Sequence, residues 1–197
     1  MKCLVVVAHP LENSLCSFLS KETISHLESI GYDVTVKNLY KEKFDPVLTE
    51  SERASYYDGH FDTDKLKSDI DQLIKTESLV LIFPTWWFGF PAILKGWFDR
   101  VWAPGHAYNH AADLGAITPC LDKLKKVTVV TTLGAPWWVD VFVLRQPVRK
   151  VLKIALLGAC AKKCSFRMFS LYKSEKLTNK KIAGFLKKIK KRFNYIG

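Results

Sequence analysis

Apolar and polar residues follow one another along this chain in two patterns, and the first pattern predicts the strands of a sheet. Cys3–Val7 and Leu79–Phe83 are continuous apolar runs, which are typical of strands buried on both faces of a parallel sheet. Asp33–Leu39 alternates between apolar and polar residues, and Val127–Thr132 and Cys164–Phe169 complete the set of segments with strand character. We expect a strand at each of these segments.

The second pattern repeats apolar residues with the period of an α-helix. It covers residues 13–29, Lys65–Lys75, Val141–Leu156 and Thr178–Phe193. Asn13 or Ser14 is the expected cap of the first of these helices, because both side chains accept a hydrogen bond from a free backbone N–H. The pattern therefore predicts helices that alternate with the strands along the chain.

A further helix is expected after Pro91, a residue that suits the first turn of a helix. Its apolar residues share one face, where the core or a subunit interface would cover them: Ile93, Leu94, Trp97, Phe98, Val101 and Trp102. Lys95, Asp99 and Arg100 fall on the opposite side, which is expected to be polar.

Strands that alternate with helices predict an α/β fold, with a parallel sheet and helices on both of its faces. The length of 197 residues suits a single domain over residues 1–197. Ligands bind such sheets at the carboxyl ends of the strands, near the point where the strand order reverses. The loops to inspect are 8–16, 84–91 and 133–140. The long connections 40–64 and 103–122 are more typical of function or of a partner contact than of structural filler.

The overall composition does not change the predicted fold, but the distribution of charge along the chain is uneven. The chain carries a net charge of +11, and residues 161–197 hold twelve lysines and arginines against a single acid, Glu175. The last helix therefore has two interpretations: it closes the domain with solvated lysines, or it presents a basic surface to anionic lipid or nucleic acid. Nucleic acid is not favoured, because the aromatic residues lie on the apolar face of this helix. Membrane contact is not favoured either.

The cysteines and the amino-terminal sequence concern location and metal binding. Five cysteines at irregular spacing (Cys3, Cys16, Cys120, Cys160 and Cys164) are typical of ordinary thiols in a reducing compartment, and we predict no metal site. The apolar run before His9 is too short for a signal peptide, and no apolar stretch reaches the roughly 18 residues of a membrane span. We expect a cytoplasmic protein.

The three loops offer chemistry that converges on one class of ligand. The first loop leads into a helix N-terminus at Ser14, where backbone N–H groups hold anions such as phosphate, and His9 adds a donor or a charge. The plainer alternative is that Ser14 only caps the helix and His9 lies at the surface.

The second loop places Trp86, Trp87 and Phe88 at a strand end, where a planar ring can lie against them. The third loop, TTLGAPWW at residues 131–138, adds two hydroxyls and two tryptophans. Together they indicate a flat cofactor that carries a phosphate, such as a flavin nucleotide.

The segment FPTWWFGFPAILKGWFDRV, residues 83–101, resembles the signature of the NAD(P)H:quinone oxidoreductases, the flavodoxin-like family that includes DT-diaphorase. The resemblance extends to Ala8-His9, Ser14, Ala107-Tyr108 and the Thr-Thr-x-Gly motif at Thr131. It implies a flavodoxin-like three-layer sandwich with a five-stranded parallel sheet. It also implies a homodimer that reduces quinones or similar electrophiles by two-electron, ping-pong hydride transfer, with FAD or FMN as cofactor and NAD(P)H as co-substrate.

The resemblance also assigns roles to residues. The flavin phosphate would lie on His9, Ser14, Leu15 and Cys16, and the isoalloxazine would meet Pro84, Thr85, Trp86, Trp87 and Phe88 on one side and Thr131, Thr132 and Gly134 on another. Tyr108 matches a tyrosine that closes the substrate pocket from the neighbouring subunit. His110 stands where relatives often have another aromatic residue, so Tyr108 and His110 are the candidate catalytic residues.

One departure from the family concerns the third loop. DT-diaphorase has a tyrosine and then a histidine after Thr-Thr-x-Gly, which help to offset charge on the reduced flavin, whereas this chain continues Ala135-Pro136-Trp137-Trp138. Backbone N–H groups or His110 across the dimer would take over that role. Two other functions fit the same fold: an electron-carrier flavodoxin, and a nucleotide-sensing regulatory subunit of a cation-efflux system.

Overall fold

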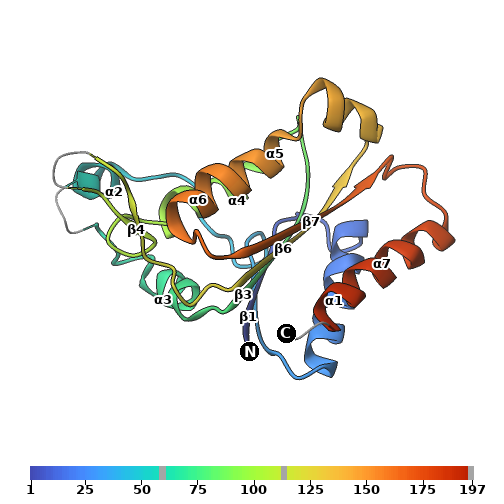
Figure 1. Cartoon of the computed structure of the whole chain (residues 1–197), viewed down its shortest axis with the longest axis horizontal. Helices are drawn as coiled ribbons and strands as arrows, with labels where there is room; N and C mark the ends of the chain where they lie inside the picture. Colours follow the sequence, from blue (N-terminus) through green and yellow to red (C-terminus); the bar gives the residue numbers. More distant parts are fainter. Residues whose placement is uncertain (58–60, 112–114, 195–197) are drawn as a thin grey trace.

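A computed structural model describes residues 1–57, 61–111 and 115–194, and its centre is a five-stranded parallel sheet (Figure 1). The strands are β1 (Lys2–Val7), β2 (Asp33–Asn38), β3 (Ser78–Pro84), β6 (Lys126–Leu133) and β7 (Ser165–Tyr172), in the spatial order β2-β1-β3-β6-β7. The predicted α/β fold with a five-stranded parallel sheet is therefore confirmed. β7 extends to Tyr172, three residues beyond the expected end at Phe169, because it pairs with β6 along its whole length.

Helices cover both faces of the sheet and make three layers. α1 (Leu15–Ser29) and α7 (Asn179–Asn194) pack on one face, in a cluster that includes Val5 and Val80. α3 (Lys67–Lys75), α4 (Ala92–Val101), α5 (Pro147–Lys150), η3 (Val151–Leu156) and α6 (Leu157–Cys160) serve the other face, around Leu4 and Leu81. Ser14 is the N-cap of α1. In the part of the chain that the structure describes, no helix is long and apolar enough to cross a membrane.

The last helix, α7, belongs to the core of the domain. Phe185, Leu186, Ile189 and Phe193 are buried against the sheet, while Lys187, Lys188 and Lys191 are exposed. Lys190 makes an ion pair with Glu22 of α1 at 2.9 Å. The prediction that this segment closes the domain with its apolar face packed on the sheet is therefore confirmed.

The helix expected over Val141–Leu156 is wrong in its start. A π-helical turn, η2, covers Val139–Val143, and the helix proper begins only at Pro147 and continues through η3 and α6 to Cys160. Arg145 and Gln146 both adopt left-handed backbone angles, with φ of 57° and 53°. Pro147 has no N–H to continue a preceding helix, so the helical pattern is interrupted before it.

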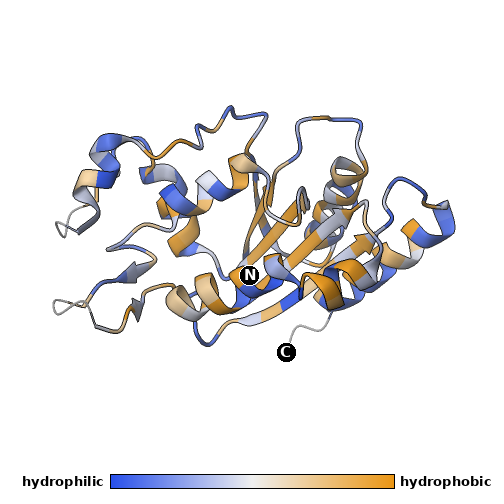
Figure 2. Ribbon diagram, turned by 90° about the horizontal axis from the view of Figure 1, so that it is seen from above, coloured by the Kyte–Doolittle hydropathy of each residue, from blue (hydrophilic) through white to orange (hydrophobic). Residues whose placement is uncertain are grey.

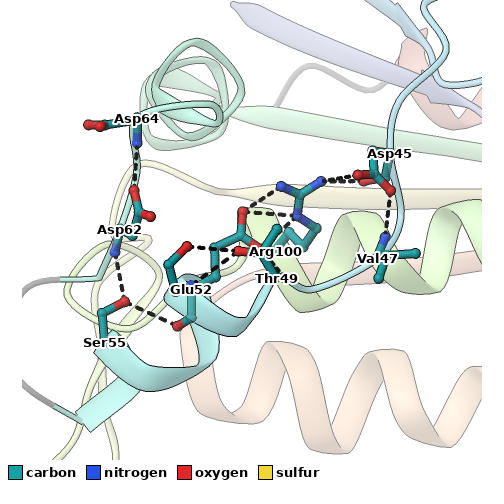
Figure 3. A network of polar contacts seen from close by, with 9 residues as sticks. Asp45, Val47, Thr49, Glu52, Ser55, Asp62, Asp64 and Arg100 are labelled. Atoms are coloured by element: carbon teal, nitrogen blue, oxygen red, sulfur yellow. Dashed lines mark hydrogen bonds and ion pairs between the residues drawn. The ribbon is translucent and has the colours of Figure 1, made fainter.

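Arg100 was expected on the polar side of its helix, and the structure corrects this. Its side chain is only 3% exposed. Glu52 of α2 (Glu50–Ala54) covers it: Arg100 Nε donates to Glu52 Oε2 at 2.9 Å, and the Asp45 carbonyl accepts from Nη1. Figure 3 shows this network, in which Glu52 also forms a capping box with Thr49. Burial of Arg100 therefore comes from a partner elsewhere in the chain and not from the spacing within α4.

The connection 40–64 is also held against α4 by a close backbone approach. A Cβ atom at Gly96 would overlap the carbonyl and the ring carbons of Pro46, so this helical position requires glycine. Both long connections contain short elements: α2 and η1 (Ser55–Tyr57) in the first, and the ribbon of β4 (Tyr108–Asn109) and β5 (Thr118–Pro119) in the second. Residues 58–60 and 112–114 of these connections lie outside the described part.

Candidate functional site

The three loops singled out in the sequence follow β1, β3 and β6, which are neighbours in the sheet. From β1 the chain moves outward to β2, and it then returns to β3 on the opposite side of β1. This is the reversal of strand order at which open parallel sheets bind their ligands. The register places Pro84 opposite Thr132, so the second and third loops leave the sheet side by side.

Direct contacts join the three loops in pairs. The Cys16 thiol and the Thr132 hydroxyl, from the first and third loops, are 3.6 Å apart. Thr85 and Thr131, from the second and third, share a hydroxyl hydrogen bond of 2.7 Å, and Thr85 N–H donates to the Thr132 carbonyl. The rings of His9 and Trp86 lie 6.2 Å apart and join the first loop to the second. The predicted site residues of the three loops therefore form one cluster.

The first loop presents donors to this cluster. The Ser14 hydroxyl accepts from Ser17 N–H at 3.1 Å, which leaves the N–H groups of Leu15 and Cys16 before the first intrahelical hydrogen bond. Leu11 N–H donates to His9 Nδ1 at 3.0 Å, so in this arrangement the ring proton of a neutral His9 is on Nε2. Ser14 thus caps α1, as its plainer interpretation says, and at the same time the helix N-terminus remains open to an anion.

The thiol beside this helix N-terminus carries no charge at neutral pH. Burial raises the pKa of Cys16 to about 11, and the hydrogen bond to Thr132 lowers it only in part. A neutral thiol does not repel an anion bound at the helix N-terminus. Cys16 is therefore a structural neighbour of the anion site and not a thiolate nucleophile.

The second loop is a tight turn with an unusual backbone. Trp86 and Gly89 exchange backbone hydrogen bonds of 3.3 and 2.8 Å, and the two residues between them, Trp87 and Phe88, have φ of 49° and 56°. Such a turn favours asparagine and glycine, and two bulky aromatic residues with left-handed angles are strained there. The turn holds the Trp87 side chain fully exposed, at 100% of its surface. Strain and exposure of this kind are typical of a functional surface.

The third loop combines buried hydroxyls with exposed rings. Thr131 and Thr132 are buried. Thr131 therefore acts on the site indirectly, because its hydroxyl is hydrogen-bonded to that of Thr85. Gly134, Trp137 and Trp138 are exposed. The aromatic side chains at 86–87 and 137–138 thus stay outside the core, whereas Trp97, Phe98 and Trp102 of the α4 region are buried in it, as expected.

A fourth segment borders the site, and sequence reasoning missed it. Directly after β7, Lys173 and Ser174 donate their N–H groups to the carbonyls of Ala135 and Leu133, and the Glu175 carboxylate lies beside Gly134. The signal was available, because β7 is parallel to its neighbours and its carboxyl end must reach the same edge. The sequence of β7 is only weakly apolar, so its pattern does not mark where this strand ends.

The structure does not bring Tyr108 and His110 to this cluster within one chain. In Figures 1 and 2, β4 lies at the far end of the molecule from the carboxyl ends of β6 and β7. The Tyr108 hydroxyl is instead 2.5 Å from that of Tyr56, and the His110 ring packs on Tyr57 at 5.0 Å. Burial and then the Tyr56 hydroxyl raise the pKa of Tyr108, so its phenol stays protonated.

Comparison with known proteins supports the fold over the whole chain. A family described as having the flavodoxin-like fold matches residues 1–193. The crystal structure of Smu.1420 from Streptococcus mutans UA159 has a TM-score of 0.85 and 30% identity, and the similarity covers 100% of both chains.

Two curated relatives carry names that describe an activity. An NAD(P)H oxidoreductase of Haemophilus influenzae is 36% identical over 113 residues, which cover 55% of this chain and 54% of the relative. NAD(P)H dehydrogenase (quinone) 1 of Cavia porcellus is 30% identical over 153 residues, which cover 68% of this chain and 54% of the relative. The chain thus spans about half the length of these curated relatives. With its sheet order and the match over residues 1–193, the chain belongs to the flavodoxin-like fold family.

Proposed function

We propose that the protein is a flavin-dependent oxidoreductase that uses NAD(P)H to reduce quinones or similar electrophiles. The observation that carries this proposal is the fully exposed Trp87 on a strained turn. The ring of Trp86 in that turn lies 6.2 Å from the ring of His9, in the loop that leads to the N-terminus of α1. An exposed indole held at an energetic cost calls for a flat partner, and an open helix N-terminus calls for a phosphate. A flavin nucleotide supplies both. The names of the two curated relatives support the same activity.

The residues present fit such a cofactor, either FAD or FMN. The N–H groups of Leu15 and Cys16, with the Nε2 proton of His9, would hold the phosphate without any opposing carboxylate from these residues. Trp86, Trp87 and Phe88 would cover one face of the ring system, and Thr85 and the third loop would border its polar edge. The hydroxyl pair of Thr85 and Thr131, which is only partly buried, fixes the spacing of these two loops.

When bound, a flavin supplies a hydride acceptor and a two-electron donor, so NAD(P)H and the electrophile use it in turn. The chain contributes position and shielding. The tryptophans exclude water from one side, and the neutral Cys16 thiol adds no negative charge. The third loop has no histidine that could offset the negative charge of a reduced flavin. Backbone N–H groups near the ring, or His110 of a second subunit, would do so instead. Free, mostly buried cysteines suit the reducing cytoplasm that we propose as its location.

The direct test is reconstitution with FMN or FAD followed by gel filtration and an absorption spectrum. We expect one flavin per chain, retained with the protein, and NADH or NADPH should bleach it until a quinone is added. A chain that retains no visible absorbance with either flavin would overturn the proposed function.

Replacing Ser14 with aspartate is expected to weaken flavin binding by about tenfold to a hundredfold, because it places a negative charge beside the phosphate. Aspartate is as good a helix cap as serine, so α1 should still form. Fluorescence titration with FMN measures the change, and Ser14→Asn, which keeps the cap without the charge, is the control. Equal losses in both variants would mean that the hydroxyl and not the charge matters, and no loss in either would remove Ser14 from the phosphate site.

We further propose that the protein is a homodimer in which Tyr108 and His110 of one subunit reach the site of the other. Two features support this arrangement. The strand β4, which begins at Tyr108, lies at the far end of the molecule from the carboxyl ends of β6 and β7 (Figure 1). Large apolar side chains also remain exposed on η2 and η3, namely Phe142, Val143, Val151 and Ile154, and an interface with a second subunit would cover them.

Replacing Tyr108 with alanine is expected to lower kcat/KM for a quinone by about tenfold while flavin affinity changes little, because the residue would contact substrate and not cofactor. Steady-state kinetics and flavin titration separate the two effects. Asn109→Ala, at the exposed neighbouring position, serves as the control. If Tyr108→Ala instead loses its flavin at unchanged stability, the tyrosine belongs to the cofactor site.

A further inference from the structure

The segment that follows β7 is held against the third loop by backbone hydrogen bonds. β6 and β7 are paired in parallel as far as Leu133 and Tyr172, so the two strands end together (Figure 1). Beyond this pair, Ser174 donates its N–H to the Leu133 carbonyl at 2.9 Å. Lys173 donates its N–H to the Ala135 carbonyl at 3.2 Å. The position of this segment relative to the third loop is therefore fixed by the main chain.

The side chain that this segment brings to the third loop is Glu175. It lies within a turn in which Lys176 N–H donates to the Lys173 carbonyl at 3.0 Å, and Lys173 has a left-handed φ of 54°. A Cβ atom at Gly134 would lie 3.4 Å from Glu175 Oε1, at ordinary contact distance. The carboxylate thus borders the glycine of the loop that we assign to the polar edge of the flavin ring.

No neighbouring cation neutralises the Glu175 carboxylate. It is the one acid in residues 161–197, yet within the described part of the chain it takes part in no ion pair. The acid of the third loop, Asp140, differs from it because Asp140 is buried and accepts a hydrogen bond of 2.7 Å from the Tyr172 hydroxyl. The strands at the centre of the molecule are largely hydrophobic (Figure 2). Glu175 therefore adds an unpaired negative charge to this edge of the site.

A negative charge at this edge acts on the reduced cofactor more than on the oxidised one. Hydride transfer from NAD(P)H gives two electrons and one proton to a neutral oxidised flavin, which gains one negative charge, while NAD(P)⁺ leaves. Like charges repel, and they do so more strongly where protein side chains exclude part of the water. The carboxylate therefore disfavours the reduced form, and the third loop has no histidine to oppose this effect.

We propose that Glu175 lowers the reduction potential of the bound flavin, so that the reduced cofactor passes its hydride to weaker electrophiles than it otherwise would. The inference rests on the proposed function. It gives the end of β7 a role in selecting the electrophile, through a side chain that is not needed to hold the cofactor.

The test is the midpoint potential of the protein reconstituted with the flavin that it retains, measured by equilibration with a reference dye. Glu175→Gln keeps the shape of the side chain and removes its charge. We expect it to raise the ratio of reduced to oxidised flavin about threefold to tenfold at a given potential, a shift of about 15–30 mV for two electrons. Glu175→Lys reverses the charge and should raise the potential further. Glu28→Gln removes an exposed acid from the last turn of α1, remote from the Ser14 cap, and should leave the potential unchanged.

Three results would overturn the proposal: an unchanged or lower potential in Glu175→Gln, shifts of opposite sign in the glutamine and lysine variants, or an equal shift in Glu28→Gln. A Glu175→Gln protein that keeps its circular dichroism spectrum but no longer retains flavin would overturn it too, because the carboxylate would then be a binding contact. The unsubstituted protein separates this failure from that of the proposed function. If it retains no flavin, both are wrong, and if it retains flavin without the expected shift in the variants, only the role of Glu175 is wrong.

Discussion

Replacing Glu52 with alanine is expected to lower the free energy of unfolding by about 3–5 kcal/mol. Arg100 and Glu52 are both 3% exposed, and Arg100 donates from Nε and Nη2 to this one carboxylate. Without the Glu52 carboxylate, the guanidinium charge remains buried, and the Asp45 carbonyl and an Asp45 carboxylate oxygen 3.9 Å from Nη1 offset it only in part. The loss also removes the capping box of α2, because Glu52 accepts from Thr49 N–H.

Urea denaturation followed by circular dichroism measures this change. Glu50→Ala, an exposed acid in the same helix, should shift the free energy of unfolding by less than about 0.5 kcal/mol. The double variant Glu52→Leu/Arg100→Met should recover much of the loss, because an apolar pair leaves no buried charge. If Glu52→Ala were as stable as Glu50→Ala, Arg100 would be able to reach solvent and the network in Figure 3 would not anchor the connection 40–64.

Replacing Ile189 with alanine is expected to cost about 2–5 kcal/mol, the range for a fully buried isoleucine. Ile189 has no exposed surface and lies at the centre of the α7 face that covers the sheet, between Phe185 and Phe193. The same denaturation experiment measures the effect, and Lys188→Ala at the exposed neighbouring position is the control. A loss below about 1 kcal/mol would show that α7 is loosely attached, and its lysines would then be free to serve as a docking surface.

The fold was predictable because its signals are local. Continuous apolar runs can be satisfied only by burial on both faces, and the two strands predicted from them, Cys3–Val7 and Leu79–Phe83, lie within one residue of β1 and β3. The helix over Val141–Leu156 was wrong at its start for a local reason too, since Pro147 follows two residues with left-handed angles. Apolar periodicity alone contains no information about backbone angles. The periodic pattern therefore continues across the two left-handed residues at which the helix is interrupted.

The meeting of the three loops of the candidate site was predictable, and the surroundings of single residues were less so. Loops at the carboxyl ends of neighbouring parallel strands meet by topology, and this rule alone is sufficient to bring His9, Trp86 and Thr132 together. The environment of Arg100 depends on Glu52, which is 48 positions away, and no periodicity within α4 contains that information. The pairing of Tyr108 with Tyr56 is of the same kind, because two connections without regular pattern meet there.

The turn at Trp87 and Phe88 has a consequence for protein engineering. Two left-handed aromatic residues cost about 1–3 kcal/mol each, and Asn-Gly is the pair that such a turn favours. A screen that ranks variants by melting temperature alone would therefore select substitutions at Trp87 and Phe88, and these substitutions would remove the exposed indole. Stabilised variants of this protein should be ranked by heat tolerance and ligand retention together, because at this turn the two properties are expected to change in opposite directions.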